Sequence, residues 1–295
     1  MQLGKIWMNG IMMDQEDARV SVITHGLHYG SAVFEGIRFY ETPDGSAIFR
    51  AVEHMERLFY SAKAIEMEMK INLEKWMEGC KKVVSENNLK SGYIRPIAFY
   101  ADGKMGLNPR GAGENYVIAA WPWGSYLGEE AIKVKISEYI RLHPKSTIAD
   151  AKISGHYVNS ILASQEIHKL GYNEALFLDY EGNVAEGPGE NIFITKDKKI
   201  YTPPKGNILA GITRDSVIKI AKDSGYEVIE KKISVQELFD ADEAFFTGTA
   251  AEITQIASID ENIYKSHDIT LKLKEKFKEI VGGQNKNYLT WLTYI

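Results

Sequence analysis

The stretch STIADAKISGHYVNSILASQE, residues 146–166, places a lysine in unusual surroundings. Lys152 is flanked by alanine, isoleucine, serine and glycine and is followed by Tyr157. An apolar stripe at helical spacing comes next and predicts a helix over about 156–170, ended by Gly171. A lysine amine has a pKa near 10.4 in water, so its use as a nucleophile requires desolvation or a nearby positive charge. The apolar flanks therefore make Lys152 a candidate for Schiff-base chemistry with a carbonyl compound.

The stretch by itself leaves a structural alternative open. A lysine at the end of a strand is more often structural or merely exposed, and a tyrosine in the first turn of a helix usually packs against its neighbours. Other motifs in the chain must decide whether Lys152 and Tyr157 share a pocket.

Composition bounds the class of protein. The chain has 295 residues, of which 44% are hydrophobic, enough for one large domain or two ordinary ones. The net charge of -5 comes from charges mixed along the sequence, so nucleic acid and anionic membranes are not expected as partners. The sequence has neither a leader-like amino terminus nor about 20 consecutive apolar residues, and we therefore expect a cytoplasmic protein.

Two kinds of potentially reactive side chain have simpler explanations. The single cysteine, Cys80, lies at helical spacing with Trp76 and Val83, which favours burial over nucleophilic chemistry and allows no disulfide within one chain. His25 and His28 lie three residues apart, without a cysteine or a pair of carboxylates nearby. Metal catalysis is therefore not expected, and no metal site is predicted.

The periodicities predict strands and helices in both halves of the chain. We expect strands at 4–10, 31–41, 92–102, 115–123 and 131–140, and helices at 53–67, 73–86, 156–170 and 212–224. The strand at 31–41 would place Phe34, Gly36 and Arg38 on one face and Val33, Glu35 and Ile37 on the other. Short apolar runs at 175–204 indicate successive hairpins.

A turn-prone stretch, PWGSYLGEE at 122–130, indicates a boundary between two units. We expect an α+β protein with a smaller N-terminal α/β domain at 1–123, an interdomain loop at 124–134 and a larger C-terminal domain at 135–295.

A carboxylate on a tight turn is the second unusual feature. In NVAEGPGENIFI, Glu186 ends a strand and a Gly-Pro-Gly turn follows it. A carboxylate presented in this way can hold a proton on a heterocyclic nitrogen. The alternative is an ordinary hairpin turn with two solvated glutamates, Glu186 and Glu190.

Two further motifs suit a phosphate. Gly211 precedes a helix that begins with Ile212 and Thr213, so unpaired backbone amides and the positive end of the helix dipole meet there. In FFTGTAAEI, small residues leave backbone amides and the Thr249 hydroxyl accessible. An ordinary helix start and an ordinary turn remain the alternatives.

The strand GYIRP sets Tyr93 and Arg95 on one face, where a phenol beside a guanidinium suits a carboxylate. Phe34 and Gly36 share a face in the same way, one supplying an apolar wall and the other leaving space above it. For either pair, core packing with a surface arginine is the alternative.

Seven motifs together resemble a known family. THGLHYGSAVFEGIRFY, EHMERL, YIRP, DAKISGHY, AEGPGENIF, AGITRD and GTAAEI occur in the order and approximate spacing of the branched-chain amino acid aminotransferases. These are pyridoxal 5'-phosphate enzymes of fold type IV, the D-amino acid aminotransferase-like fold, and the resemblance extends from about residue 3 to the C-terminal WLTYI. It implies two domains, the larger one with barrel-like β-structure. It also implies reversible transamination of leucine, isoleucine or valine with 2-oxoglutarate.

The resemblance implies a role for each matched residue near the cofactor. Lys152 would form the Schiff base with pyridoxal phosphate and move the proton from the substrate α-carbon. Glu186 would pair with the ring nitrogen, and Tyr157 would hydrogen-bond the ring phenolate oxygen. The phosphate would be held by Arg57, Ile212, Thr213 and Thr249.

Substrate roles are implied in the same way. Tyr93 and the amides of Thr249 and Ala250 would hold the α-carboxylate. Arg95 would bind the γ-carboxylate of glutamate, which must enter the same pocket as the branched side chains. The residues expected to shape that pocket or assist Arg95 are Tyr29, Phe34, Gly36, Met105, Trp123 and Tyr126.

The sequence departs from the family pattern before Tyr157, where Ser154, Gly155 and His156 replace the Gly-Gly-Asn of many relatives. The run into Lys152 matches only loosely, although Arg141 and Pro144 are retained. D-Amino acid aminotransferase and aminodeoxychorismate lyase share the fold and remain alternatives, against which the Tyr-x-Arg pair speaks. The family also implies a homodimer or homohexamer, with Tyr29 or the Met105 loop reaching across an interface.

Overall fold

The structure, a computed structural model, describes residues 4–124 and 126–295. The described chain divides into two compact units. The first unit contains residues 4–124, 151–156 and 280–295, and the second contains residues 126–150 and 157–279. The chain therefore enters the first unit a second time around Lys152 before returning to the second. Residues 1–3 and 125, which belong to the predicted N-terminal domain and loop, lie outside the described residues.

This division differs from the predicted one at two short segments that the sequence assigns to the C-terminal domain. Ala151 and Ile153 are buried in the hydrophobic core of the first unit. The strand β16 (Leu292–Tyr294) pairs antiparallel with β5 (Gly45–Phe49) of the same unit. Both segments are held by contacts distant in sequence, which a search for linkers along the chain does not detect.

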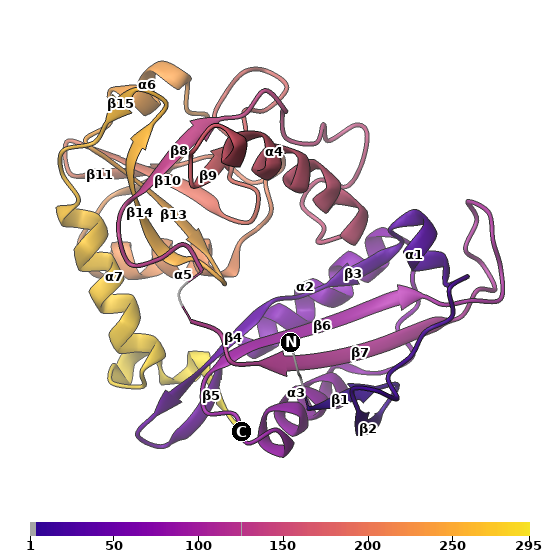
Figure 1. The fold of residues 1–295 in the computed structure, drawn as a ribbon. Helices are drawn as coiled ribbons and strands as arrows, with labels where there is room; N and C mark the ends of the chain where they lie inside the picture. Colours follow the sequence, from indigo (N-terminus) through magenta and orange to yellow (C-terminus); the bar gives the residue numbers. More distant parts are fainter. Residues whose placement is uncertain (1–3, 125) are drawn as a thin grey trace. The chain divides into compact units, whose positions relative to one another are not determined.

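The first unit is built on one antiparallel sheet. Its strand order is β16-β5-β4-β6-β7-β1-β2, with β3 also paired to β6. Its remaining elements are β1 (Lys5–Met8), β2 (Ile11–Asp14), α1 (His25–Tyr29), β3 (Ala32–Phe34), β4 (Ile37–Thr42), α2 (Ala51–Ala64), α3 (Leu73–Glu86), β6 (Gly92–Tyr100), β7 (Glu114–Trp121), η1 (Ser154–His156) and η2 (Lys286–Trp291). In Figure 1, α3 runs beside the long strands β6 and β7, and α2 contacts α3 and β3.

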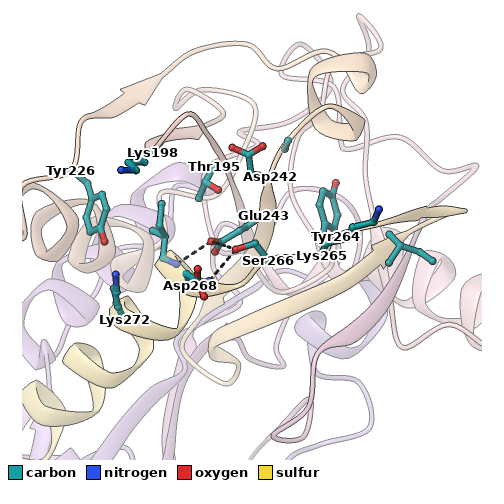
Figure 2. Close-up of a pocket in the computed structure, with 13 residues that line it drawn as sticks. Thr195, Lys198, Tyr226, Asp242, Glu243, Tyr264, Lys265, Ser266, Asp268 and Lys272 are labelled. Atoms are coloured by element: carbon teal, nitrogen blue, oxygen red, sulfur yellow. Dashed lines mark hydrogen bonds between the residues drawn. The ribbon is translucent and has the colours of Figure 1, made fainter.

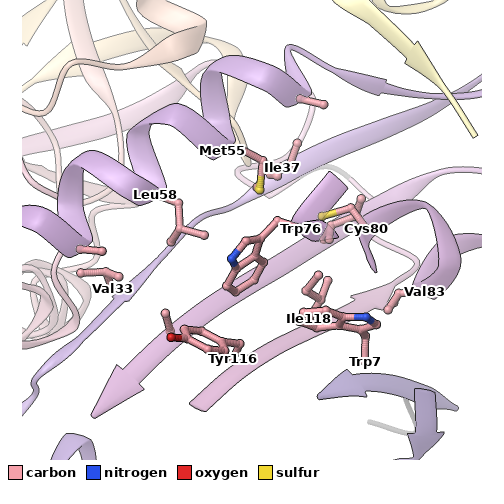
Figure 3. Packing of buried hydrophobic residues seen from close by; sticks show 14 of the residues in the cluster. Trp7, Val33, Ile37, Met55, Leu58, Trp76, Cys80, Val83, Tyr116 and Ile118 are labelled. Carbon is pink, nitrogen blue, oxygen red and sulfur yellow. The ribbon is translucent and has the colours of Figure 1, made fainter. Parts of the chain in front are cut away.

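Aromatic residues fill the core between this sheet and its two helices. Trp76 of α3 is fully buried, and its ring centroid lies 5.5 Å from that of Trp7 and 5.8 Å from that of Tyr116. Figure 3 shows Cys80 on the same helix, also pointing into this cluster. Burial raises the pKa of the Cys80 thiol to about 12. The predicted structural role of the cysteine agrees with this placement.

The predicted strand at 31–41 is interrupted. β3 ends at Phe34 and β4 begins at Ile37, although both pair with β6. Opposite the break lies Pro96, which has no N–H to donate, and its carbonyl accepts a hydrogen bond from Glu35 N (2.9 Å). Glu35 and Gly36 thus leave the ladder, so the alternation predicted for one continuous strand does not apply to them.

The second unit contains another sheet, ordered β12-β11-β10-β13-β14-β8-β9, with β15 also paired to β14. Most neighbours are antiparallel, but β8 is parallel to both β14 and β9, and β11 is parallel to β12. Its elements are β8 (Ile132–Ile136), α4 (Tyr157–Lys169), β9 (Glu174–Leu176), β10 (Asn191–Lys196), β11 (Lys199–Thr202), α5 (Ile212–Asp223), β12 (Val228–Glu230), α6 (Val235–Phe239), β13 (Glu243–Gly248), β14 (Glu252–Ile259), β15 (Asn262–Ile263) and α7 (Asp268–Val281), whose last residues belong to the first unit.

The hairpins predicted at 175–204 are only partly present. β10 and β11 form one, with Asp197 and Lys198 both at positive φ, as a two-residue turn between twisted strands requires. Residues 177–190 instead carry isolated bridges, Leu178 to Val184 and Glu186 to Asn191. Across residues 4–124 and 126–295, no helix has the length and apolar character needed to span a membrane.

Candidate active site

Lys152 is anchored through its backbone in the first unit. Its N–H donates to the Ser61 hydroxyl (2.9 Å), and its carbonyl accepts from Phe34 N (3.2 Å). The next residue, Ile153, forms an antiparallel bridge with Val33. These contacts fix the lysine backbone between α2 and β3.

The ring of Phe34 contacts two cations. Lys152 Nζ lies 4.9 Å from the ring centroid, and Arg95 Cζ lies 4.8 Å from it. Arg95 Nη2 also donates to the Tyr93 hydroxyl (3.3 Å), which places Tyr93 and Arg95 on one face of β6 as predicted. An amine, an apolar ring, a guanidinium and a phenol therefore lie together.

Gly36 makes room for Tyr93. A Cβ atom at this position would lie 1.7 Å from the Tyr93 hydroxyl oxygen. The Tyr93 ring packs against Trp123 (4.7 Å between centroids) and Trp121 (5.4 Å), forming an aromatic wall. Arg38 secures the end of this wall by donating to the carbonyls of Trp123 and Gly124.

A buried ion-pair network supports the next predicted residue, Arg57. Its Nε and Nη2 donate to the carboxylate of Glu35 at 2.6 and 2.9 Å. His54 Nδ1 lies 2.6 Å from the same carboxylate, and both Glu35 and His54 are fully buried. Arg57 and Ser61 are four residues apart on α2 and so share a helix face, which brings the arginine to the side of the helix that holds Lys152.

Tyr29 and Met105 are partly exposed, at 42% and 44%. His25 links their two segments, since its ring packs on Tyr29 (4.5 Å) and its Nε2 lies 2.7 Å from the Gly106 carbonyl. The other ring nitrogen lies 2.6 Å from the Ser31 hydroxyl. His25 thus has a structural role that joins α1 to the 101–113 loop, and the described residues contain no cluster of three metal-ligating side chains.

The segment that departs from the family pattern packs closely. Gly155 N donates to the Gly30 carbonyl (3.1 Å), and a Cβ at Gly30 would lie 2.7 Å from Gly155 Cα. Gly30 has φ of 64°, a left-handed value that glycine adopts readily. The Ser154–His156 turn therefore rests directly on the end of α1.

In the second unit, Glu186 is buried and fixed from three directions. Its carboxylate accepts from Arg141 Nε (2.5 Å), from Asn191 Nδ2 (2.9 Å) and from Leu209 N (3.1 Å). A carboxylate with three donors, one of them a guanidinium, is stabilised in its ionised form. The predicted alternative, a solvated turn, does not describe this residue.

The same asparagine links Glu186 to the start of α5. Asn191 Nδ2 also donates to the Leu209 carbonyl (3.0 Å), and a Cβ at Gly211 would lie 1.9 Å from Asn191 Oδ1. Gly211 is the N-cap of α5, and its first turn receives no hydrogen bond from a capping side chain. Ile212 and Thr213 are buried there, so a glycine is required for the helix start to lie against the carboxylate cluster.

Two further predicted segments join this cluster. Thr249 and Ala250 lie in the turn between β13 and β14. The preceding Gly248 packs on the Gly189 carbonyl, where an added Cβ would lie 3.0 Å away. Ser160 of α4 donates to the Pro188 carbonyl (2.8 Å), and Tyr157 lies one turn earlier on that helix.

The geometry thus forms two groups. The contacts described above bring together one group in the first unit: Lys152, Phe34, Gly36, Tyr93, Arg95, Trp123 and Arg57. Tyr29 and Met105 of the same unit are exposed. In the second, Glu186, Tyr157, Ile212, Thr213, Thr249 and Ala250 lie around the Gly-Pro-Gly turn, while Tyr126 is exposed on a loop.

The chain matches the family model described as Amino-transferase class IV over residues 32–259. The chain is a class IV aminotransferase. The match extends from β3 to β14 and includes all the residues of both groups except Tyr29.

Similar proteins cover the whole chain. A branched-chain-amino-acid aminotransferase from Pseudomonas aeruginosa is 44% identical over 99% of this chain and 97% of its own length. The T.th. branched-chain amino acid aminotransferase, solved with N-(5'-phosphopyridoxyl)-L-glutamate, has a TM-score of 0.97 and 45% identity, covering 100% of this chain and 99% of its own. The same enzyme solved with 4-methylvaleric acid has a TM-score of 0.96 and 44% identity over the same shares.

Sequence reasoning missed several residues of this aminotransferase. Glu35, His54, Ser61 and Asn191 were assigned no role, and Arg141 was noted only as retained. For Glu35 a signal existed, since a lone acid shared the predicted face of apolar Val33 and Ile37. A charge at such a position needs a buried partner. For the others, the partners are distant in sequence and no local pattern reveals them.

The aminotransferase also has a hollow of about 770 Å³ in its second unit (Figure 2). Glu243 on its wall pairs across the sheet with Thr195, whereas Asn191 pairs with Thr247 at the other end of the same two strands, about 13 Å away. The Glu243 carboxylate accepts hydrogen bonds from Ile269 N and Thr270 N at the start of α7 and from Ser266 Oγ. The described residues that line the hollow include none of the predicted site residues, and its buried acid serves to cap a helix.

Proposed function

We propose that the protein catalyses reversible transamination between branched-chain L-amino acids and 2-oxoglutarate, with pyridoxal 5'-phosphate held by Lys152. The contact of the Phe34 ring with both Lys152 Nζ and Arg95 carries the proposal. The amine thus shares one wall with an apolar surface and a guanidinium. An aliphatic side chain suits the apolar surface, and the γ-carboxylate of glutamate suits the guanidinium. The T.th. enzyme, solved with a phosphopyridoxyl-glutamate and with an acid that has the carbon skeleton of leucine, supports this pairing.

The residues of the second unit fit this cofactor. A buried carboxylate with three fixed donors suits a protonated ring nitrogen, because it stays ionised and cannot rotate away. The first turn of α5, begun by Gly211 and not capped by a side chain, suits a phosphate. Asn191 contacts both features, which supports their acting on one ligand.

When bound, pyridoxal phosphate supplies an aldehyde that bonds covalently to amines and a ring that withdraws electrons from the substrate α-carbon. Lys152 would hold the aldehyde and, once displaced, move the α-carbon proton. Glu186 would keep a proton on the ring nitrogen, and Tyr157 would donate to the ring oxygen. Arg57, Thr249 and the α5 amides would bind the phosphate.

The contacts of Tyr93 and Arg95 support the proposed substrate roles. Tyr93, placed by Gly36 and its aromatic neighbours, would hold the α-carboxylate together with the Thr249 and Ala250 amides. Arg95 would bind the γ-carboxylate of glutamate at the rim, beyond the reach of an aliphatic side chain. Tyr29, Met105, Trp123 and Tyr126 complete the proposed pocket.

Replacing the lysine tests this function. We expect Lys152→Ala to lose turnover of L-leucine with 2-oxoglutarate and the visible absorbance of bound cofactor. Lys145→Ala, which removes an exposed lysine seven residues earlier, is the matched control and should keep both. Normal leucine turnover by Lys152→Ala would overturn the proposal. If the unaltered protein consumed D-alanine instead of L-leucine, the activity would be that of a D-amino acid aminotransferase. If it consumed aminodeoxychorismate instead, the activity would be that of an aminodeoxychorismate lyase.

We also infer a homodimer, or a hexamer built from dimers. Large apolar side chains are exposed on and before α1 and on the 101–113 loop, including Val22 (82%), Leu27 (65%) and Leu107 (87%). Exposed apolar groups of this kind commonly mark protein interfaces. Tyr29 and Met105 lie on the same two segments and would reach the partner subunit. We expect light scattering to find dimers or larger species; a fully active monomer would contradict the inference.

We propose a cytoplasmic location, because the single cysteine forms no disulfide. The one cysteine, Cys80, is buried and unpaired, as is usual in a reducing compartment. Fractionation of cells that express the native gene would test this, and recovery outside the cytoplasm would refute it.

A further inference from the structure

Glu35 connects two parts of the proposed site. Its carboxylate accepts hydrogen bonds from Arg57 Nε (2.6 Å) and Nη2 (2.9 Å) and from the backbone N–H of Gly36 (3.2 Å). Arg57 is the proposed phosphate ligand, and Gly36 is the residue that makes room for Tyr93. One buried side chain therefore touches both the cofactor and the substrate part of the first unit.

His54 contacts the same Glu35 carboxylate. It lies three residues before Arg57 on α2, and its Nδ1 is 2.6 Å from Glu35 Oε2. The neighbouring guanidinium and histidine hold the pKa of Glu35 below its usual range, so the carboxyl is ionised and can only accept. His54 must therefore donate its Nδ1 proton. Burial lowers the pKa of His54, which favours the neutral ring.

The buried network of Glu35, His54 and Arg57 is not explained by packing alone. A buried ion pair loses its hydration, and apolar residues of the same volume are often at least as stabilising. Here the Glu35 carboxylate accepts two parallel hydrogen bonds from Arg57. This bidentate contact fixes the plane of the guanidinium as well as its position. An arginine held in this way need not be ordered when an anion binds, so less affinity is lost.

We propose that Glu35, backed by His54, is a positioning residue that fixes the Arg57 guanidinium for the cofactor phosphate. The inference rests on the proposed function, in which Arg57 binds that phosphate. It predicts that Glu35 affects ligands through the phosphate group and leaves recognition of the aldehyde and ring unchanged.

The test compares pyridoxal 5'-phosphate with pyridoxal, which lacks the phosphate. The dissociation constant of each is measured by absorbance titration of the full-length chain after its cofactor has been removed. The variants are Glu35→Gln and His54→Phe. Glu41→Gln is the matched control, because it makes the same chemical change in an exposed ion pair between Glu41 of β4 and Lys90.

We expect Glu35→Gln to weaken pyridoxal phosphate binding by about 10- to 100-fold, by analogy with the loss of a partner that orients a metal ligand. Pyridoxal binding should change less than about threefold, so the preference for the phosphate form falls. His54→Phe should cause a smaller loss with the same selectivity, and Glu41→Gln should cause none. His54→Phe keeps the test decisive if Glu35→Gln does not fold.

Equal weakening of both ligands, or of neither, would overturn the inference, since a purely structural role predicts no dependence on the phosphate. Failure of the unaltered protein to bind either ligand would instead refute the proposed function. The two failures are therefore distinguishable.

Discussion

Gly36 shows how one missing side chain determines the position of another. A Cβ at this residue would lie 1.7 Å from the Tyr93 hydroxyl oxygen, so any larger residue must displace the tyrosine. A misplacement of about 1 Å can reduce a reaction rate about 100-fold. We therefore expect Gly36→Ala to lower kcat/KM for L-leucine by roughly that factor. Gly124→Ala, where an added methyl meets open space, is the control in steady-state assays. Unchanged kcat/KM in Gly36→Ala would exclude the proposed role of Tyr93.

Cys80 makes a simple probe of the first unit's core. The thiol is buried and its pKa is raised to about 12, so little thiolate is available to react at pH 8. We expect no measurable reaction of the folded protein with an aromatic disulfide reagent on the time scale of minutes. One thiol per chain should react promptly after unfolding in guanidinium chloride. Prompt labelling of the folded protein would contradict the packing around Trp76.

At the residue scale, the sequence suggests candidate catalytic and binding groups more readily than the residues that hold them in place. Lys152, Glu186 and Tyr93 stand out because a charged or phenolic group appears in a setting of glycines and apolar residues. Arg141 and Asn191 do not stand out, because their function lies in hydrogen bonds to a carboxylate that other segments supply. Candidate site residues can be proposed from local context, whereas the residues that orient them depend on tertiary contacts.

At the scale of elements, α7 begins where Glu243 meets it. The buried carboxylate accepts from Ile269 N (3.0 Å), Thr270 N (2.9 Å) and the Thr270 hydroxyl (2.7 Å), so it serves as a helix cap from a neighbouring strand. Loss of such a partner leaves buried donors unsatisfied at a cost of about 1–3 kcal/mol. We expect Glu243→Ala to lower the free energy of unfolding by that amount in urea denaturation. Glu261→Ala, at an exposed turn of the same unit, should change it little.

The predicted elements succeeded where local signals dominate. The helix predicted at 73–86 coincides with α3, because its apolar spacing and the Asn72 N-cap are both encoded locally. The strand predicted at 31–41 did not persist through Glu35 and Gly36, because the interruption arises from Pro96 on a partner strand. The parallel pairing of β8 with β9 and β14 was also not predicted, since it joins segments far apart in the sequence.

At the scale of the whole molecule, the buried His54 and Glu35 couple stability to pH. His54, whose pKa burial lowers from 6.5, faces Glu35, Arg57 and Lys152. Below about pH 6.5 the His54 imidazole becomes protonated in the unfolded chain but stays neutral in the folded chain. The free energy of unfolding therefore falls as the pH falls. Glu35, whose pKa is also lowered, adds a second loss below about pH 4.5 for the same reason.

Each such proton changes the unfolding free energy by up to about 1.4 kcal/mol per pH unit. We expect urea denaturation midpoints to decline between pH 7 and 5.5, and His54→Phe to remove part of that decline because the variant has no imidazole to protonate. His28→Phe, which alters a histidine outside this network, should retain the full slope. An identical slope in His54→Phe and the unaltered protein would show that the imidazole has the same pKa in the folded and the unfolded chain, contrary to its burial beside the Arg57 guanidinium and the Lys152 side chain.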